Sequence, residues 1–333
     1  MESDTLNLVF AYVLDGKGGA KRIDWKEIRA WNPESETIWV HLDRAGTESQ
    51  RWLEDESGVS RVVCEALLAG ASRPRSLRYD AGLLLNCRGV NLTGNKDEKL
   101  EDMVSLKIWA EPGRIITARH REVKALKDVE NILKDDHVNG PHDIGDLVVC
   151  ILDKLLDKMG PKIDELLDAI DGIEIGVSNA ENLQRGSKAS LSGLRVRAIG
   201  LRRYLAPQRE VFSRLPIEEF PLFDMDHRVQ LREISDRATR MVEDLDAARE
   251  RASIVQDDIT QLLSERQERA TLVLTVVAAI FLPLGLLTGL WGVNAGGVPF
   301  SSEEQWWGFW VVVAVLLAMT LAALWGFRRM RLL

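Results

Sequence analysis

A row of oxygen-bearing side chains recurs every three or four residues along one predicted helix in the last third of the chain. This polar row consists of Asp257, Gln261, Ser264, Glu268, Thr271 and Thr275, and the same spacing ends it at Leu282. Residues three and four apart lie on one face of a helix. Carboxylate, amide and hydroxyl oxygens are ligands for hard divalent cations and for the water around them. The row could therefore line a path for hydrated cations.

Positions at the same spacing extend back along the helix to Asp236 and include Asp246. None of these positions carries a basic residue, although the helix is rich in arginine. One interpretation is the solvated outer face that coiled coils of mixed charge present. The other is a water-lined face, because Thr271 and Thr275 continue the row into an uncharged segment, where polar side chains usually face protein or water. Both interpretations stay open, and the hydroxyls favour the second. If several copies of the helix surround an axis, the row lines an acidic tube that narrows at Leu282.

Two long uncharged segments near the C-terminal end predict membrane-spanning helices. Segments 270–291 and 306–327 each have about 22 residues, and about 20 are enough to cross the hydrocarbon core of a bilayer. Basic residues precede the first segment, at Arg266 and Arg269, and follow the second in the tail 328–333, whereas the loop 292–305 carries only acidic charges. Since basic flanks stay inside, we expect a multi-pass protein of the cell inner (plasma) membrane with both termini in the cytoplasm. The N-terminal residues have no features of a signal peptide.

The preceding part of the chain predicts an α+β cytoplasmic domain followed by helices. Residues 1–140 contain apolar runs separated by Gly and Pro, which predict a mixed β-sheet with flanking helices. The runs are Leu6–Leu14, Thr37–Leu42, Ala81–Leu92, Met103–Ala110 and Arg114–Arg119. Residues 141–223 predict a helical hairpin. Residues 224–269 predict a long stalk helix, because apolar residues repeat at heptad spacing from Leu231 to Leu262 with no Pro or Gly between them.

The composition narrows the classes of function. The chain has 333 residues and a net charge of −8, which argues against a nucleic-acid partner and favours attraction of cations. Cys64, Cys87 and Cys150 form no CxxC pair and fit buried thiols in a reducing compartment. We find no glycine-rich phosphate loop and no Ser/His/Asp pattern, so we expect neither an enzyme nor a bound cofactor.

A segment with both acidic residues and histidines is a second candidate site. It contains Asp135, Asp136, His137, His142, Asp143 and Asp146. Imidazole and carboxylate groups can hold a regulatory metal ion, and His137, His142 and Asp143 are the first candidates for its ligands. A solvated turn around Gly140 and Pro141 explains the same residues without a metal, and this alternative also stays open.

The end of the first apolar segment carries a recognisable motif. The tract 281–294 reads FLPLGLLTGLWGVN, and Gly296-Gly297-Val298-Pro299 follows it. This tract resembles the CorA-type metal ion transporter superfamily with its GxN signature, and the GVN form followed by two glycines is similar to the zinc-transporting ZntB branch. Segments 14–19, 68–75 and 202–210 resemble the same branch, so the likeness covers nearly the whole chain. It implies a CorA-like homopentamer in a lipid bilayer, with a funnel-shaped cytoplasmic domain and a pore lined by the long helix.

The resemblance also implies roles for individual residues. Gly292, Val293 and Asn294 match the pore mouth, where a ring of amide oxygens would meet the water shell of a dication. Glu303 and Glu304 in the outer loop would concentrate cations at that entrance. Four members of the polar row match the pore-lining positions of the family when counted back along the helix from the motif: Leu282, Thr271, Glu268 and Asp257.

Zinc as the transported substrate follows from the resemblance alone. Tight zinc sites use Cys and His, and neither the polar row nor the outer loop contains one. Transport of magnesium, cobalt or nickel therefore stays an alternative, and a membrane-tethered oligomeric scaffold or sensor is an alternative of a different class. A dication gains roughly 4 to 5 kcal/mol per 100 mV on moving to the negative inside, so an uncoupled pore would import it. Symport with protons stays open, with Asp257 or Glu268 as the proton carriers.

Overall fold

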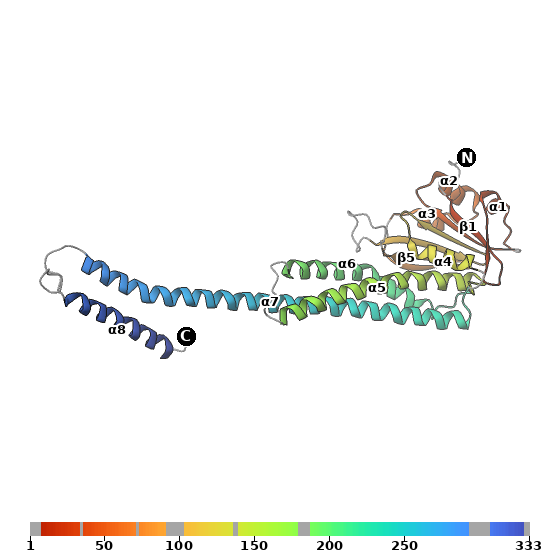
Figure 1. Cartoon of the computed structure of the whole chain (residues 1–333). Helices are drawn as coiled ribbons and strands as arrows, with labels where there is room; N and C mark the ends of the chain where they lie inside the picture. The colour runs from red at the N-terminus through yellow and green to blue at the C-terminus, as the bar shows by residue number, and fades with distance from the viewer. Residues whose placement is uncertain are drawn as a thin grey trace. The chain divides into compact units, whose positions relative to one another are not determined.

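The computed structural model describes residues 8–33, 36–70, 73–90, 103–135, 139–178, 187–292 and 307–329. Contacts divide the chain into two compact units, residues 1–256 and 257–333. The first unit holds a β-sheet and its covering helices, and the second holds the end of the longest helix and the last helix of the chain (Figure 1). The finer division of the chain into seven segments, which the sequence suggests, remains a prediction.

A seven-stranded mixed sheet forms the core of the first unit, with the strand order β2-β1-β3-β7-β6-β5-β4. Only β3 and β7 pair in parallel, and all other neighbours are antiparallel. All eight residues of β5 are buried, because helices cover both faces of the sheet. The strands are β1 (Leu8–Leu14), β2 (Ala20–Arg22), β3 (Thr37–Asp43), β4 (Arg75–Tyr79), β5 (Gly82–Gly89), β6 (Val104–Glu111) and β7 (Arg114–Arg119).

The two faces of the sheet have separate helical covers. On one face, Val40 of β3 and Leu84 of β5 share a core with Leu67 of α3. On the other face, the Tyr12 hydroxyl of β1 donates a hydrogen bond of 2.7 Å to Glu130 of α4. The short helical elements are α1 (Trp25–Ala30), α2 (Thr47–Arg51), the π-helical turn η1 (Trp52–Glu56), α3 (Arg61–Leu68) and α4 (Lys124–Lys134).

Three long helices complete the first unit: α5 (Ile144–Ser178), α6 (Ser187–Arg214) and the first part of α7 (Met225–Gly292). Most heptad residues of α7 are buried here, including Leu231, Leu245 and Ala252 at 0% exposure, as the spacing predicts. Ion pairs add to this packing. Arg237 of α7 lies 2.6 Å from the Asp157 carboxylate of α5 and also pairs with Asp153. Further along, Arg251 of α7 pairs with Asp171 and Glu174 of α5.

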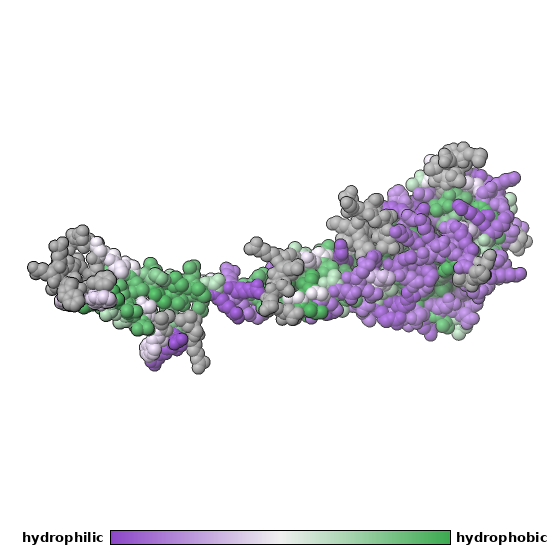
Figure 2. All heavy atoms as spheres, in the orientation of Figure 1, coloured by the Kyte–Doolittle hydropathy of each residue, from purple (hydrophilic) through white to green (hydrophobic). Residues whose placement is uncertain are grey.

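The second unit contains the rest of α7 and helix α8 (Gly308–Arg329). Both helices are long and apolar enough to cross a membrane. Their large apolar side chains are exposed, for example Leu274 at 69% and Leu321 at 63%, and Figure 2 shows apolar residues predominating along this unit. Such a continuous apolar surface is not stable in water and fits a lipid bilayer. The predicted α+β fold with a long helix and two candidate transmembrane helices is therefore confirmed, whereas the homopentamer remains a prediction.

The buried hydroxyl of Thr117 in β7 provides a first test of the fold. The Trp39 Nε1–H donates to Thr117 Oγ1 at 2.9 Å, and His41 Nδ1 lies 2.8 Å from the same oxygen. Burial, together with the charge of Arg119, lowers the pKa of His41 well below 6.5, so the ring is neutral inside the sheet. We expect Thr117→Val to destabilise the protein by about 1 to 3 kcal/mol, because it leaves two buried ring nitrogens without this oxygen.

Thermal unfolding of the full-length protein in detergent measures this effect. The matched control is Ser213→Ala, since the Ser213 hydroxyl is exposed and donates to the Glu210 carbonyl of its own helix at 3.0 Å. The control should unfold at the same temperature as the parent protein. An unchanged unfolding temperature for Thr117→Val would contradict the assigned hydrogen bonds.

Candidate functional site

The polar row and Leu282, at which its spacing ends, lie along α7 in the second unit. The six residues of the row and Leu282 are exposed in the single chain. They share one face of one uninterrupted helix, so no other segment is needed to align them. The earlier position Asp246 differs, because its carboxylate pairs with Arg202 of α6 at 2.6 Å in the first unit. Asp257 is the first of the predicted site residues along α7, and its side chain is exposed.

The hydroxyl groups of the row are bonded to their own helix. Ser264 donates to the Thr260 carbonyl at 3.0 Å, Thr271 to the Gln267 carbonyl at 2.9 Å, and Thr275 to the Thr271 carbonyl at 2.8 Å. Each hydroxyl has one proton and two lone pairs. Because the proton is donated to a backbone carbonyl, the oxygen can only accept hydrogen bonds from an outside partner. A surface of acceptors suits a hydrated cation and repels an anion.

Part of the row borders a cavity between α7 and α8. This open cavity of about 580 Å³ is lined on α7 by Ser264, Glu268, Thr271 and Thr275, and on α8 by Phe327. A carboxylate and three hydroxyls would be costly to expose to acyl chains. Water or another protein surface is the physically suitable occupant of this cavity.

Several predicted site residues lie outside the described part of the chain. Gly292 is the last residue of α7, whereas Val293 and Asn294 of the motif, and Glu303 and Glu304 of the outer loop, follow it in segment 293–306. The pore mouth therefore remains a prediction from the resemblance. His137, one of the three candidate metal ligands, also lies outside the described residues.

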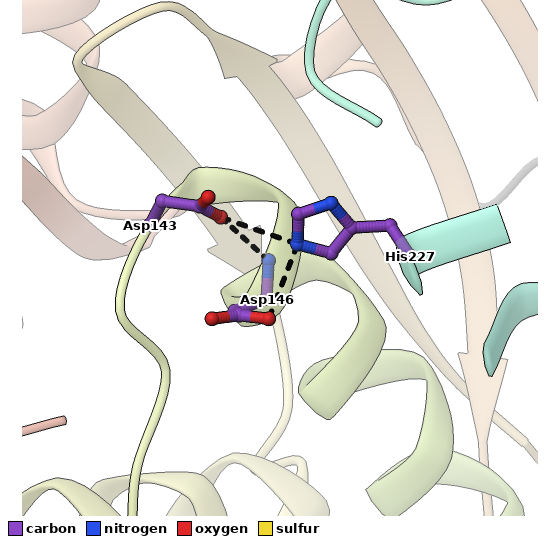
Figure 3. A group of neighbouring side chains, drawn as sticks. All are labelled: Asp143, Asp146 and His227. Atoms are coloured by element: carbon purple, nitrogen blue, oxygen red, sulfur yellow. Dashed lines mark hydrogen bonds and ion pairs between the residues drawn. The ribbon is translucent and has the colours of Figure 1, made fainter. Parts of the chain in front are cut away.

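The second candidate site gathers two carboxylates and an imidazole, as Figure 3 shows. Asp143 and Asp146 come from the start of α5, and His227 comes from the first turn of α7. His227 Nε2 lies 3.1 Å from Asp146 Oδ1 and 3.4 Å from Asp143 Oδ1. One potential ligand atom of each residue lies within 4.8 Å of the other two, so they can reach one ion. We call these three residues the Asp–His cluster.

Helix capping positions the Asp–His cluster. Asp143 Oδ1 accepts the backbone N–H of Asp146 at 2.8 Å, and Asp224 Oδ1 accepts the backbone N–H of His227 at 2.9 Å. Both carboxylates thus satisfy free donors at a helix start. Gly145 supplies the space for the imidazole, because a Cβ on it would lie 2.8 Å from His227 Nε2. The ring is consequently held at the start of α5 with its side chain only 5% exposed.

Two of the three predicted metal ligands lie at this site, and their role remains a prediction. Asp143 lies in the cluster, and His142 lies beside it, with Nδ1 3.2 Å from Asp146 Oδ2. Burial alone would raise the pKa of the Asp146 carboxyl, but the hydrogen bonds from His142 and the charge of His227 outweigh this and lower the pKa. The prediction missed His227, which is 81 positions from Asp146 in the sequence. No local pattern around His227 indicates this contact.

Known proteins match this chain over nearly its whole length. The family model described as "CorA-like Mg2+ transporter protein" matches residues 34–329. The divalent cation transporter CmaX of Pseudomonas aeruginosa is 36% identical over 331 residues, which cover 98% of this chain and 97% of that protein. The zinc transport protein ZntB of Yersinia pseudotuberculosis is 35% identical over 321 residues, which cover 96% of this chain and 94% of that protein.

Solved structures agree with these sequence matches. The structure of full-length CmaX has a TM-score of 0.85 and 35% identity to this chain, and it covers 99% of this chain and 100% of its own. The CorA magnesium transporter from Methanocaldococcus jannaschii has a TM-score of 0.78 at 19% identity, covering 96% of this chain and 98% of its own. The second likeness is one of fold alone.

Proposed function

Because the chain belongs to the family of CorA-like Mg2+ transporter proteins, we propose that it carries Zn²⁺ into the cell through a central pathway in a homopentamer. Membership makes it a divalent-cation transporter of the membrane, with two helices that fit the bilayer. The zinc preference, the number of subunits and the direction of transport are the parts that we propose. Placement in the inner membrane with both termini in the cytoplasm belongs to the same proposal.

The row of outward-facing acceptors on α7 is the observation that carries this proposal. One α7 helix exposes the row on a single side and cannot enclose a path alone. Several copies around an axis would place the rows face to face, and water between them would keep a dication hydrated, so no costly dehydration is needed. At the outer end, a ring of Asn294 amide oxygens would meet the same water shell.

The choice of zinc rests on similarity to the zinc transport protein ZntB, at 35% identity over nearly the whole chain. Magnesium, cobalt or nickel is the second candidate substrate, because CmaX is named for divalent cations in general and the family for Mg²⁺. The acceptors of the polar row are oxygens, which distinguish poorly among dications. Flux of each metal under identical conditions decides between these candidates.

The membrane potential supplies the direction of transport in this proposal. An uncoupled pathway for a dication conducts inward under an inside-negative potential. Proton symport is an alternative drive, in which Asp257 or Glu268 would bind the proton. Both carboxyls belong to the polar row and are exposed in the single chain.

Zinc uptake by liposomes that contain the Asn294→Leu variant tests the proposed function. We expect at least about a tenfold lower rate, because leucine removes the acceptor ring at the entrance and leaves an apolar constriction. Asn294→Gln is the matched control, since it keeps an amide oxygen, and it should retain most of the flux. A fluorescent zinc indicator inside the vesicles provides the measurement.

The same experiment addresses the scaffold or sensor, the alternative of a different class. A membrane-tethered scaffold needs no acceptor at position 294, so its properties would not change with Asn294→Leu. Equal vesicle zinc signals for the parent protein, the leucine variant and empty liposomes would reject transport and leave the scaffold.

A further inference from the structure

We propose that the Asp–His cluster is a binding site for a transition-series divalent cation such as Zn²⁺ or Co²⁺, separate from the transport pathway. Asp143, Asp146 and His227 all belong to the first unit, whereas the polar row belongs to the second. The site would hold the ion with one imidazole nitrogen and two carboxylate oxygens and leave a further position for water.

The distances between the donor atoms support a shared ion. Zinc bonds to nitrogen and oxygen of about 2.0 to 2.1 Å place neighbouring tetrahedral ligands about 3.4 Å apart. His227 Nε2 lies 3.4 Å from Asp143 Oδ1 and 3.1 Å from Asp146 Oδ1. The longer of these separations exceeds the usual 2.7 to 2.9 Å of an N–H···O⁻ hydrogen bond. The atoms are thus close to the spacing of metal ligands without a large movement.

A carboxylate also lies on the side of the imidazole that faces away from Asp143 and Asp146. The other ring nitrogen, Nδ1, lies 2.8 Å from Asp224 Oδ1. The backbone N–H of Asp224 donates to Nδ1 at 3.2 Å, and Nε2 faces Asp143 and Asp146. A metal ion that takes the lone pair of Nε2 would require the proton on Nδ1, where the Asp224 carboxylate can accept it. A carboxylate in this place orients metal-bound histidines and makes them better ligands. Gly145 leaves room for the ring, because a Cβ at that position would lie 2.8 Å from His227 Nε2.

The negative charge around the His227 ring also favours binding of a cation. Asp143, Asp146 and Asp224 surround His227, and among the described residues none of these three carboxylates forms an ion pair with a lysine or arginine. Even a protonated imidazole would leave the group with a net negative charge. A divalent cation would balance it.

The mixed donor set predicts which cations the site takes. Imidazole nitrogen favours zinc, cobalt and nickel, whereas Mg²⁺ prefers oxygen ligands in an octahedron and keeps its water. An ion can reach the site from a neighbouring cavity of about 510 Å³, which Asp146 and His142 line. Occupancy would tie the first turn of α7 to the start of α5.

Titration of the full-length, metal-free protein in detergent with Co²⁺ tests this proposal, because bound Co²⁺ absorbs visible light in a way that depends on its ligands. We expect a Co²⁺ spectrum with nitrogen ligation, displaced by Zn²⁺ and unaffected by a large excess of Mg²⁺. His227→Gln and Asp143→Asn should each weaken this Co²⁺ binding at least about tenfold. Asn caps a helix as well as Asp does, so Asp143→Asn should keep the fold.

Asp226→Asn is the matched control. Asp226 is exposed and precedes His227 in the sequence, and its substitution removes one negative charge, as Asp143→Asn does. It should bind Co²⁺ like the parent protein. Unfolding temperatures measured in EDTA show whether each variant folds. A parent protein without the displaceable Co²⁺ spectrum, or a folded Asp143→Asn with unchanged affinity, would overturn the proposal and leave the cluster as an ion-pair link between helices. The Co²⁺ titration measures binding and not transport. A protein that fails to transport zinc could therefore still confirm or contradict this metal site.

Discussion

The double variant Thr271→Leu/Thr275→Leu is expected to lose at least about 90% of its cation flux. Both hydroxyls present acceptor lone pairs from the polar row, because each donates its proton to its own helix. Leucine at both positions removes two water-binding oxygens one turn apart and replaces them with apolar surface. A hydrated dication would then have to shed water without compensation, and a barrier increase of only about 1.4 kcal/mol already slows flux tenfold.

Initial rates of zinc entry into liposomes give the measurement for this double variant. The control is Val273→Leu/Val277→Leu, which adds apolar volume to the same helix at exposed positions outside the row. This control should transport at the parent rate. The conservative pair Thr271→Ser/Thr275→Ser keeps both hydroxyls and should also transport. Parent-like flux in the double leucine variant would show that the row faces away from the pathway.

Reversing the membrane potential should produce the second large effect. With 100 mV negative inside, a dication gains about 4.6 kcal/mol on entry, which corresponds to an equilibrium accumulation of more than a thousandfold. Liposomes with a potassium diffusion potential should therefore take up zinc rapidly at this polarity and show almost no net uptake at the opposite one. The comparison uses the same external zinc concentration and equal pH on both sides.

Two further conditions separate the possible driving forces. Vesicles that contain Asn294→Leu should respond weakly to either polarity, which excludes leakage through the lipid. A pH gradient at zero potential tests symport, since protons moving inward would drive zinc uptake without voltage. Equal uptake at both polarities, with uptake that follows the pH gradient, would replace the uncoupled pathway by proton symport.

The sheet shows which strands can be predicted from local sequence. Five strands lie in or at predicted apolar runs, and β5, which is buried along its whole length, is the clearest case. The prediction missed β2 (Ala20–Arg22) and β4 (Arg75–Tyr79), which are the two edges of the sheet. Most of their residues are at least partly exposed, and β4 contains two arginines, so neither has an apolar run. Edge strands are held by pairing to a neighbour, and local composition does not reveal this partner.

The two candidate sites also differ in how far local sequence can predict them. The polar row depends on a single helix, so its spacing alone aligns Asp257 with Thr275, and its role in transport remains a prediction. The Asp–His cluster depends on two helices that meet only in the folded chain. Local sequence therefore indicated Asp143 and His142 and gave no sign of His227 or of the opening above Gly145.

Helix α7 passes through Pro283 without a break. Proline has no amide hydrogen, so the carbonyl oxygen of Ala279 loses its usual donor four residues later, and the ring crowds the preceding turn. Helix α7 is consequently easiest to bend at the level of Pro283 within its apolar segment. Bending at that level would let the portion of α7 that carries Thr271 and Thr275 tilt relative to the portion that leads to Gly292.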